Sequence, residues 1–76
     1  MVKAYILVSA QPTKAVGLAG AIRAVRGITA ADAVTGEYDV IAACEVADVK
    51  SLGELILNGV HRVDGVAKTT TCIVVT

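Results

Sequence analysis

The stretch Val34-Thr35-Gly36-Glu37-Tyr38-Asp39 joins two apolar runs of strand length near the middle of the chain. Its glycine has polar neighbours on both sides, a pattern that predicts a β-hairpin with a loop of about three to five residues. The same stretch gathers a hydroxyl, two carboxylates and a phenol into the consecutive positions Thr35 to Asp39. Because loops on rigid strands often carry binding groups, this hairpin is also a candidate functional site.

The two runs beside the hairpin differ in polarity. Ile28–Thr35 is diluted by alanine and carries Asp32, which is typical of a strand at the edge of a sheet. Asp39–Val46 is apolar on both alternating faces, which is typical of a central strand. Two further strands are predicted, Lys3–Ala10 at the start of the chain and Ala67–Thr76 at its end.

The segment between the first and second strands predicts a helix. Pro12 suits its first turn, because proline lacks the backbone donor that would be unpaired there. Apolar residues then recur at three- and four-residue spacing, which indicates one buried stripe, and Gly27 ends the helix. The stripe consists of Ala15, Leu18, Ala19, Ile22 and Val25.

A second helix is predicted after the third strand. Asp48 can cap its N-terminus, the helix ends near His61-Arg62, and the turn Asp64-Gly65 leads into the last strand. The same apolar spacing predicts one buried face. This face consists of Val49, Leu52, Ile56 and Val60, with Leu55 beside them.

The chain contains an internal repeat. Ile22–Ile28 resembles Val60–Val66 at an offset of 38 residues, which is half of the chain. Two copies of a strand-helix-strand unit joined by a hairpin predict one α+β domain over residues 1–76, with the ferredoxin-like split βαβ fold (βαββαβ). In this fold an antiparallel four-stranded sheet has the strand order 4-1-3-2 and carries both helices on one face.

This fold leaves the other face of the sheet without helices. Strands one, three and four are read as apolar on both faces, so we expect a second subunit to cover the open face, and a sheet-to-sheet homodimer is predicted. Cys44 and Cys72 lie in apolar runs and are expected to be buried, reduced thiols. Strand one lies between them in the predicted order, which argues against an intrachain disulfide.

The composition excludes several classes of partner. Seven basic side chains balance seven acidic ones among 76 residues, and no Lys/Arg cluster occurs, so we expect no direct binding to nucleic acid or to an anionic membrane. No apolar run has the length of a transmembrane helix, and the N-terminus lacks the features of a signal peptide. The protein is expected to be soluble and cytoplasmic.

No motif predicts a catalytic or metal site. The only histidine, His61, lies near Asp64, and we interpret it as a side chain placed favourably at a helix C-terminus. The sequence has no nucleophile with a base at a recognisable spacing, no metal-ligand set and no phosphate-binding glycine loop. No catalytic residue, metal or cofactor is assigned, although a small dimeric enzyme remains the less favoured alternative.

Three motifs, in the right order and spacing, resemble the effector domain of the Lrp/AsnC family of regulators, also called the RAM domain. They are the apolar strand Ala4–Val8, the Gly-x-Tyr-Asp turn at Gly36–Asp39 and the Gly-Val-x-x-Thr-x-Thr pattern at Gly65–Thr71. The resemblance covers nearly the whole chain. It implies a domain that binds amino acids at the junctions between dimers, which assemble into rings that are commonly octamers.

One departure from the family pattern concerns DNA. Family transcription factors place a helix-turn-helix domain before this one, whereas Met1 lies directly at the first strand. We therefore expect a stand-alone effector domain, which acts indirectly in the transcriptional regulation of amino-acid metabolism, through full-length Lrp/AsnC regulators as partners. A purely structural oligomerisation module is the main alternative.

The hairpin offers the groups that a free amino acid requires. Charge matching predicts that Asp39 binds the ammonium, while backbone amides around Gly36 and Glu37 bind the carboxylate. The resemblance implies that Tyr38 forms a wall or a hydrogen bond, and that a neighbouring last strand adds two threonine hydroxyls. The predicted ligand-binding residues are Gly36, Glu37, Tyr38, Asp39, Thr69 and Thr71.

Overall fold

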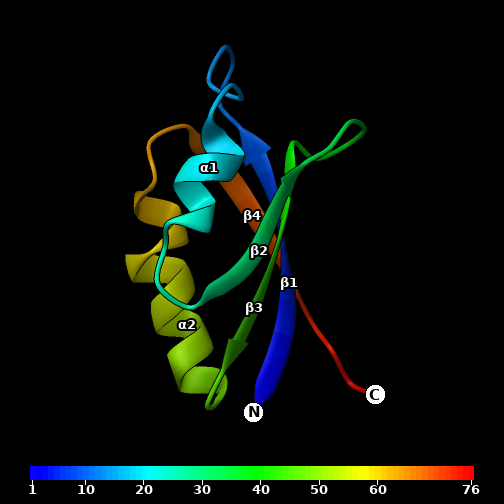
Figure 1. Cartoon of the computed structure of the whole chain (residues 1–76), viewed down its shortest axis with the longest axis vertical. Helices are drawn as coiled ribbons and strands as arrows, with labels where there is room; N and C mark the ends of the chain where they lie inside the picture. Colours follow the sequence, from blue (N-terminus) through cyan, green and yellow to red (C-terminus); the bar gives the residue numbers. More distant parts are fainter.

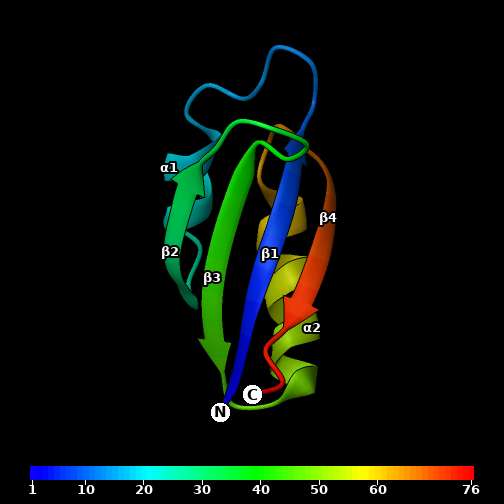
Figure 2. The ribbon, with the colours of Figure 1, turned by 90° about the vertical axis from the view of Figure 1, so that its right-hand side faces the viewer.

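The computed structural model describes residues 1–76 as one four-stranded sheet with two α-helices and a short 3-10 helix. Figure 1 shows both α-helices on the same side of the sheet. All neighbouring strands are antiparallel, and their order is β2-β3-β1-β4 (Figure 2). The predicted ferredoxin-like fold and strand order are therefore confirmed. The elements are β1 (Val2–Ala10), α1 (Leu18–Arg23), β2 (Ile28–Ala33), β3 (Val40–Val46), α2 (Val49–Asn58), the 3-10 helix η1 (Val60–Arg62) and β4 (Val66–Ile73).

The strands repeat at the offset seen in the sequence. β1 begins at Val2 and β3 at Val40, while β2 begins at Ile28 and β4 at Val66, so both pairs are separated by 38 residues. Each half of the chain contributes one central strand and one edge strand. The two halves therefore share one strand-helix-strand order, although their helices do not repeat at this offset, since α1 begins at Leu18 and α2 at Val49.

The core between the sheet and the helices consists of small side chains, since the chain has no Phe or Trp. Complete burial of a Val, Leu or Ile side chain contributes about 1.5–3 kcal/mol, so many modest contributions replace a few large aromatic ones. The buried residues are Ala4, Ile6, Val8, Leu18, Ile22, Ala31, Val40, Ala42, Cys44, Leu52, Leu55 and Val60.

The first helix is shorter than predicted. It begins at Leu18 rather than at Pro12, and Gln11–Gly17 forms an irregular loop. Thr13 and Gly17 have positive φ angles of 68° and 80°, and this left-handed backbone region interrupts a right-handed helix. Of the predicted stripe, Leu18 and Ile22 are buried, Ala19 and Val25 are half-buried, and Ala15 is exposed in the loop.

The second helix begins as predicted. Asp48 Oδ1 accepts a hydrogen bond from Ser51 N at 2.7 Å, and this bond lowers the pKa of the Asp48 carboxyl. Val49 was predicted to be buried, but it is 64% exposed, because it occupies the first helical position, before the first residue that packs on the core. Of the rest of the predicted face, Leu52, Leu55 and Val60 are buried and Ile56 is half-buried.

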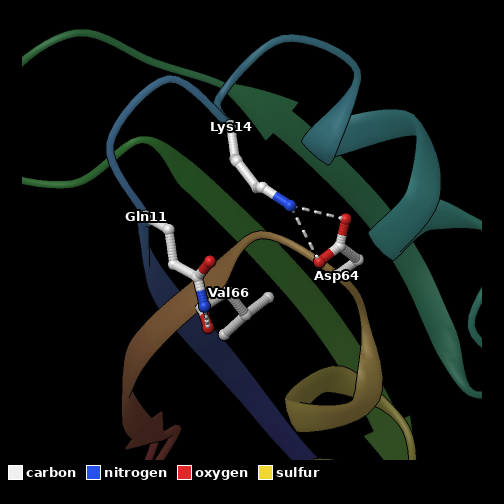
Figure 3. Close-up of polar contacts among 4 residues, drawn as sticks. All are labelled: Gln11, Lys14, Asp64 and Val66. Carbon is white, nitrogen blue, oxygen red and sulfur yellow. Dashed lines mark hydrogen bonds and ion pairs between the residues drawn. The ribbon is translucent and has the colours of Figure 1, made fainter.

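The loop before α1 is fastened to the turn before β4. Gln11 N donates to the carbonyl of Gly65 at 2.7 Å, and Lys14 Nζ lies 3.1 Å from Asp64 Oδ2 (Figure 3). Gly65 has a φ of 103°, and a Cβ at this position would lie 3.2 Å from the carbonyl oxygen of Lys14. A larger residue would separate these two segments, so glycine is needed at this crossing.

The sheet face that carries no helices, called here the outer face, is apolar only in its middle. Tyr5 and Ile41 are 41% and 37% exposed there, next to the half-buried Leu7 and Ala43. The prediction that the fourth strand is apolar on both faces is wrong, because β4 carries polar side chains on both, with Lys68 and Thr70 outward and Thr69 and Thr71 toward the helices. The outward residues of β4 are Lys68, Thr70 and Cys72.

The two cysteines lie on opposite faces of the sheet. Cys44 pairs with Ala4 and faces the core, and burial raises the pKa of its thiol. Cys72 pairs with Tyr5 and is exposed on the outer face. The predicted burial is therefore right for Cys44 and wrong for Cys72. Both thiols are free, and β1 lies between them.

Candidate functional site

The predicted polar hairpin lies at one end of the sheet and projects to the side away from the helices (Figure 1). Val34 N donates to the carbonyl of Asp39 at 2.9 Å, which closes the loop. Gly36 has a φ of 122°, a conformation that favours glycine. The hairpin is therefore confirmed, although its connection is longer than predicted, since β2 ends at Ala33 and β3 begins at Val40.

Asp39 is hydrogen-bonded to strand β1 through its backbone and through its side chain. Its N–H donates to the carbonyl of Val8 at 2.9 Å, and its Oδ2 accepts from Ala10 N at 2.7 Å. Its other carboxylate oxygen, Oδ1, has no hydrogen-bond partner in the chain and is accessible to solvent. The carboxylate is thus held in place at one oxygen and free to bind at the other.

The backbone of the loop carries unused donors. The N–H groups of Gly36, Glu37 and Tyr38 make no hydrogen bond within the chain. The side chain of Glu37 is exposed and that of Tyr38 is half-buried. Successive free N–H groups in a turn form a site that suits an anionic oxygen, so the loop has donors for a carboxylate as well as an acceptor for an ammonium.

The two predicted threonines do not meet the loop within one chain. Thr69 pairs with Val8 and Thr71 with Ile6, so β1 lies between them and the hairpin. Both threonines share the sheet face of the buried Val8 and Ile6, toward the helices, whereas the hairpin projects to the opposite side (Figure 1). One protomer therefore brings together Gly36–Asp39 but neither threonine.

Thr69 has a different partner. Its Oγ1 lies 2.8 Å from His61 Nε2. Asp64, which is close to His61 in the sequence, instead pairs with Lys14. His61 and Asp64 therefore form no hydrogen-bonded pair of the kind that general base catalysis uses.

Two contacts at this end of the sheet were missed by the sequence reasoning. One is the hydrogen bond from Ala10 N to Asp39, and the other is the contact between His61 and Thr69. A backbone N–H leaves no signature in residue types, so the sequence did not indicate that Ala10 N is the donor to Asp39. For His61, the nearby hydroxyl-rich run Thr69–Thr71 was a signal that could have been used.

Neither α1 nor α2 has the length and the apolar character of a membrane-spanning helix.

Solved structures with the same architecture include two of nearly equal size. TTHA0845 from Thermus thermophilus has a TM-score of 0.90 and 26% identity, over 100% of this chain and 95% of that chain. The hypothetical protein PHS023 from Pyrococcus horikoshii has a TM-score of 0.87 and 28% identity, over 100% and 92%. The transcriptional regulator NMB0573 from Neisseria meningitidis, in complex with L-Met, has a TM-score of 0.85 and 23% identity. That match covers 99% of this chain and 50% of the regulator.

Sequence comparison gives a family but no individual relative. No curated protein matches the sequence of this chain. The sequence profile of the family described as "Lrp/AsnC ligand binding domain" matches residues 3–76, so the resemblance drawn from the three motifs is confirmed. The chain belongs to the Lrp/AsnC ligand-binding domain family.

Proposed function

We propose that this domain binds a free amino acid, assembles with copies of itself and acts indirectly in the transcriptional regulation of amino-acid metabolism. The observation that carries the proposal is that one loop holds both free donors and a free acceptor. The donors are the N–H groups of Gly36, Glu37 and Tyr38, and the acceptor is Oδ1 of Asp39. This set of groups occurs in a chain whose family is defined by ligand binding.

The chemistry of the loop matches the two charges of an amino acid. The N–H groups of Gly36 and Glu37 donate to the ligand carboxylate, and Asp39 Oδ1 accepts from the ligand ammonium. Hydrogen bonds to charged groups contribute about 1.5–3 kcal/mol each. The half-buried ring of Tyr38 forms a wall beside the ligand side chain. Glu37 acts through its backbone, because its side chain is exposed.

A second copy of the chain completes the site. Thr69 and Thr71 lie on the helix side of their own sheet, so they reach a hairpin only from a neighbouring protomer. The apolar middle of the outer face, around Tyr5 and Ile41, supports a sheet-to-sheet homodimer. Dimers of this kind then associate into an octamer-like ring, with the amino acid at the junction between dimers.

Amino acids are favoured as the ligand class by one of the similar structures. NMB0573 from Neisseria meningitidis, which shares this fold, was solved in complex with L-Met. A ligand of that class carries the ammonium and carboxylate that the hairpin groups match.

The proposed regulatory partners are full-length Lrp/AsnC regulators that carry the same domain. The net charge of zero and the lack of a Lys/Arg cluster disfavour direct binding to DNA. Regulation by this chain therefore passes through co-assembly, in which the outer face and the hairpin meet the matching surfaces of a regulator. No catalytic step is part of the proposed role.

A purely structural oligomerisation module is the second candidate function. It is favoured by the hydrogen bond between Ala10 N and Asp39 Oδ2, because this bond gives the turn carboxylate a role without any ligand. The two candidates differ in whether Asp39 Oδ1 and the loop N–H groups meet a ligand.

The deciding experiment is a thermal-shift screen of the common amino acids at millimolar concentration, on the wild type and on Asp39→Asn. Asparagine keeps an oxygen for Ala10 N but removes the charge that binds an ammonium. We expect stabilisation by at least one amino acid, and binding weaker by about 30-fold in Asp39→Asn. Stabilisation by none of them would favour the structural module, and an equal shift in the variant would place the ligand elsewhere.

A further inference from the structure

A hollow lies between α2 and the turn that joins α1 to β2, away from the hairpin. It is a groove of about 790 Å³. Val46 lines it at the end of β3, opposite the end that carries the hairpin. The residues that matter for its chemistry are Val25, Arg26, Val46, Glu54, Leu55 and Asn58.

The walls of this groove carry opposite charges that are not used within the chain. Arg26 and Glu54 are both exposed. Their side chains form no ion pair, because the single ion pair of the chain joins Lys14 to Asp64. Neither of them, nor the amide of Asn58, makes a side-chain hydrogen bond. A guanidinium and a carboxylate therefore flank the groove with their hydrogen-bonding capacity free.

The floor of the groove is apolar and closely packed. Leu55 is buried, and Val25 and Val46 are half-buried. A Cβ placed on Gly59 would lie 2.7 Å from Val25 Cγ1, and one placed on Gly27 would lie 3.3 Å from Leu55 Cδ1. The end of α2 and the turn after α1 are thus in direct contact below the groove, which fixes the spacing of its two walls.

The internal repeat provides a comparison with a related groove in the other half of the chain. At the offset of 38 residues, Arg26 corresponds to Asp64 and Glu54 to Val16. Asp64 and Val16 line a smaller groove of about 370 Å³. In that groove Lys14 Nζ already neutralises Asp64 at 3.1 Å. The acidic side chain of the smaller groove is therefore already paired within the chain, whereas Arg26 and Glu54 have no ion-pair partner in the chain.

We infer that the groove between Arg26 and Glu54 is a second ligand site, for a small zwitterion with an aliphatic body. Arg26 binds the carboxylate of the ligand with paired N–H donors, and Glu54 binds its ammonium. The aliphatic body lies on Val25, Val46 and Leu55. A free amino acid and a dipeptide share this chemistry. The site is separate from the hairpin, so its existence does not depend on the proposed function.

The test is a titration of ¹⁵N-labelled protein, followed by NMR, with two probes, L-leucine and L-alanyl-L-leucine. We expect millimolar binding of at least one probe, with shifts of the amides of Arg26 and Glu54. The probe that binds more tightly identifies the source of the zwitterion. Shifts at Gly36–Asp39 report the hairpin separately, so failure at one location is distinguishable from failure at the other. No shift at Arg26 and Glu54 with either probe would overturn the inference.

Charge-deleted variants and ligands assign the two roles. N-acetyl-L-leucine lacks the ammonium and L-leucinamide lacks the carboxylate. We expect the Glu54→Gln variant to bind L-leucine with an affinity about tenfold lower than that of the wild type. This variant should bind L-leucine and N-acetyl-L-leucine equally well. Arg26→Gln should likewise lose the preference for L-leucine over L-leucinamide. Lys14→Gln, which removes a charge from the related groove, is the matched control and should leave these affinities unchanged. Equal weakening in the control, or wild-type affinity in Arg26→Gln and Glu54→Gln, would contradict the assignment.

Discussion

Asp39 Oδ2 accepts a hydrogen bond from the backbone N–H of Ala10 at 2.7 Å. This bond joins the hairpin loop to the end of β1, where the pairing with β4 shifts register between Ser9 and Ala10. The carboxylate therefore takes the place of a backbone acceptor at an irregular end of the sheet. The same contact orients the carboxylate and leaves Oδ1 without a hydrogen-bond partner in the chain.

This relationship predicts different stabilities for two substitutions of Asp39. Asp39→Ala leaves Ala10 N without its partner and should lower the free energy of unfolding by about 1.5 kcal/mol. Asp39→Asn retains an oxygen acceptor and should cost about half of that or less. Urea unfolding followed by circular dichroism measures both values. An alanine variant as stable as the wild type would show that the bond contributes nothing to the fold.

The strand order was predictable because several independent patterns agreed. The repeat between Ile22–Ile28 and Val60–Val66, the hairpin glycine and the apolar alternation of the central strands all indicated the same topology. The start of α1 was not predictable in this way. Proline at position 12 is compatible with both a helix start and a turn. Threonine rarely adopts a positive φ, so the φ of 68° at Thr13 could not be predicted from its residue type.

The candidate site was predictable only in part, for a related reason. Gly36 and Asp39 have local signatures, and the loop that they form exists. The direction in which a side chain points on β4 depends on register, and a shift by one residue moves every side chain to the other face. The separation of Thr69 and Thr71 from the hairpin by β1 followed from the predicted strand order, but the sheet face that they share with Val8 and Ile6 could be read only from the register.

Gly36 allows a clean test of backbone conformation. A Cβ at this position would meet no atom within 4 Å, yet its φ is 122°. Gly36→Ala should therefore lower the free energy of unfolding by at least about 1 kcal/mol through backbone strain alone. Gly20, inside α1, is the matched control, since a Cβ there also meets nothing within 4 Å.

Gly20→Ala should raise the free energy of unfolding by about 0.5–1 kcal/mol, because alanine favours a helix. Thermal and urea unfolding measure the change in the free energy of unfolding of each variant. These changes should have opposite signs, negative for Gly36→Ala and positive for Gly20→Ala. A stabilising Gly36→Ala would mean that the loop adopts an ordinary conformation in solution.

Neighbouring alanines on β3 separate folding from assembly. Ala42 is completely buried against the core, whereas Ala43 pairs with Tyr5 on the outer face and is half-buried. Ala42→Asp buries an unpaired charge and should cost about 4 kcal/mol or more, enough to unfold a small domain. Ala43→Asp should keep the fold but dissociate the proposed dimer.

Circular dichroism and sedimentation velocity measure these two properties independently. The expected result is an unfolded Ala42→Asp and a folded, monomeric Ala43→Asp. A folded Ala43→Asp variant with the sedimentation coefficient of the wild type would rule out an interface through the middle of the outer face.

The cysteines report on the same interface without any substitution. Cys72 is exposed on the outer face of a single protomer, while Cys44 is buried. Burial raises the pKa of the Cys44 thiol, which lowers its thiolate fraction at a given pH, so Cys44 should react with a thiol reagent only after denaturation. Cys72 should react in the native monomer and become protected as the protein concentration rises, because the proposed dimer covers its face. Labelling with Ellman's reagent across a dilution series, analysed by mass spectrometry for the modified residue, measures this protection. Sedimentation shows over which concentrations the sample passes from monomer to dimer. If the rate of Cys72 labelling does not change over this range, the interface lies on another surface.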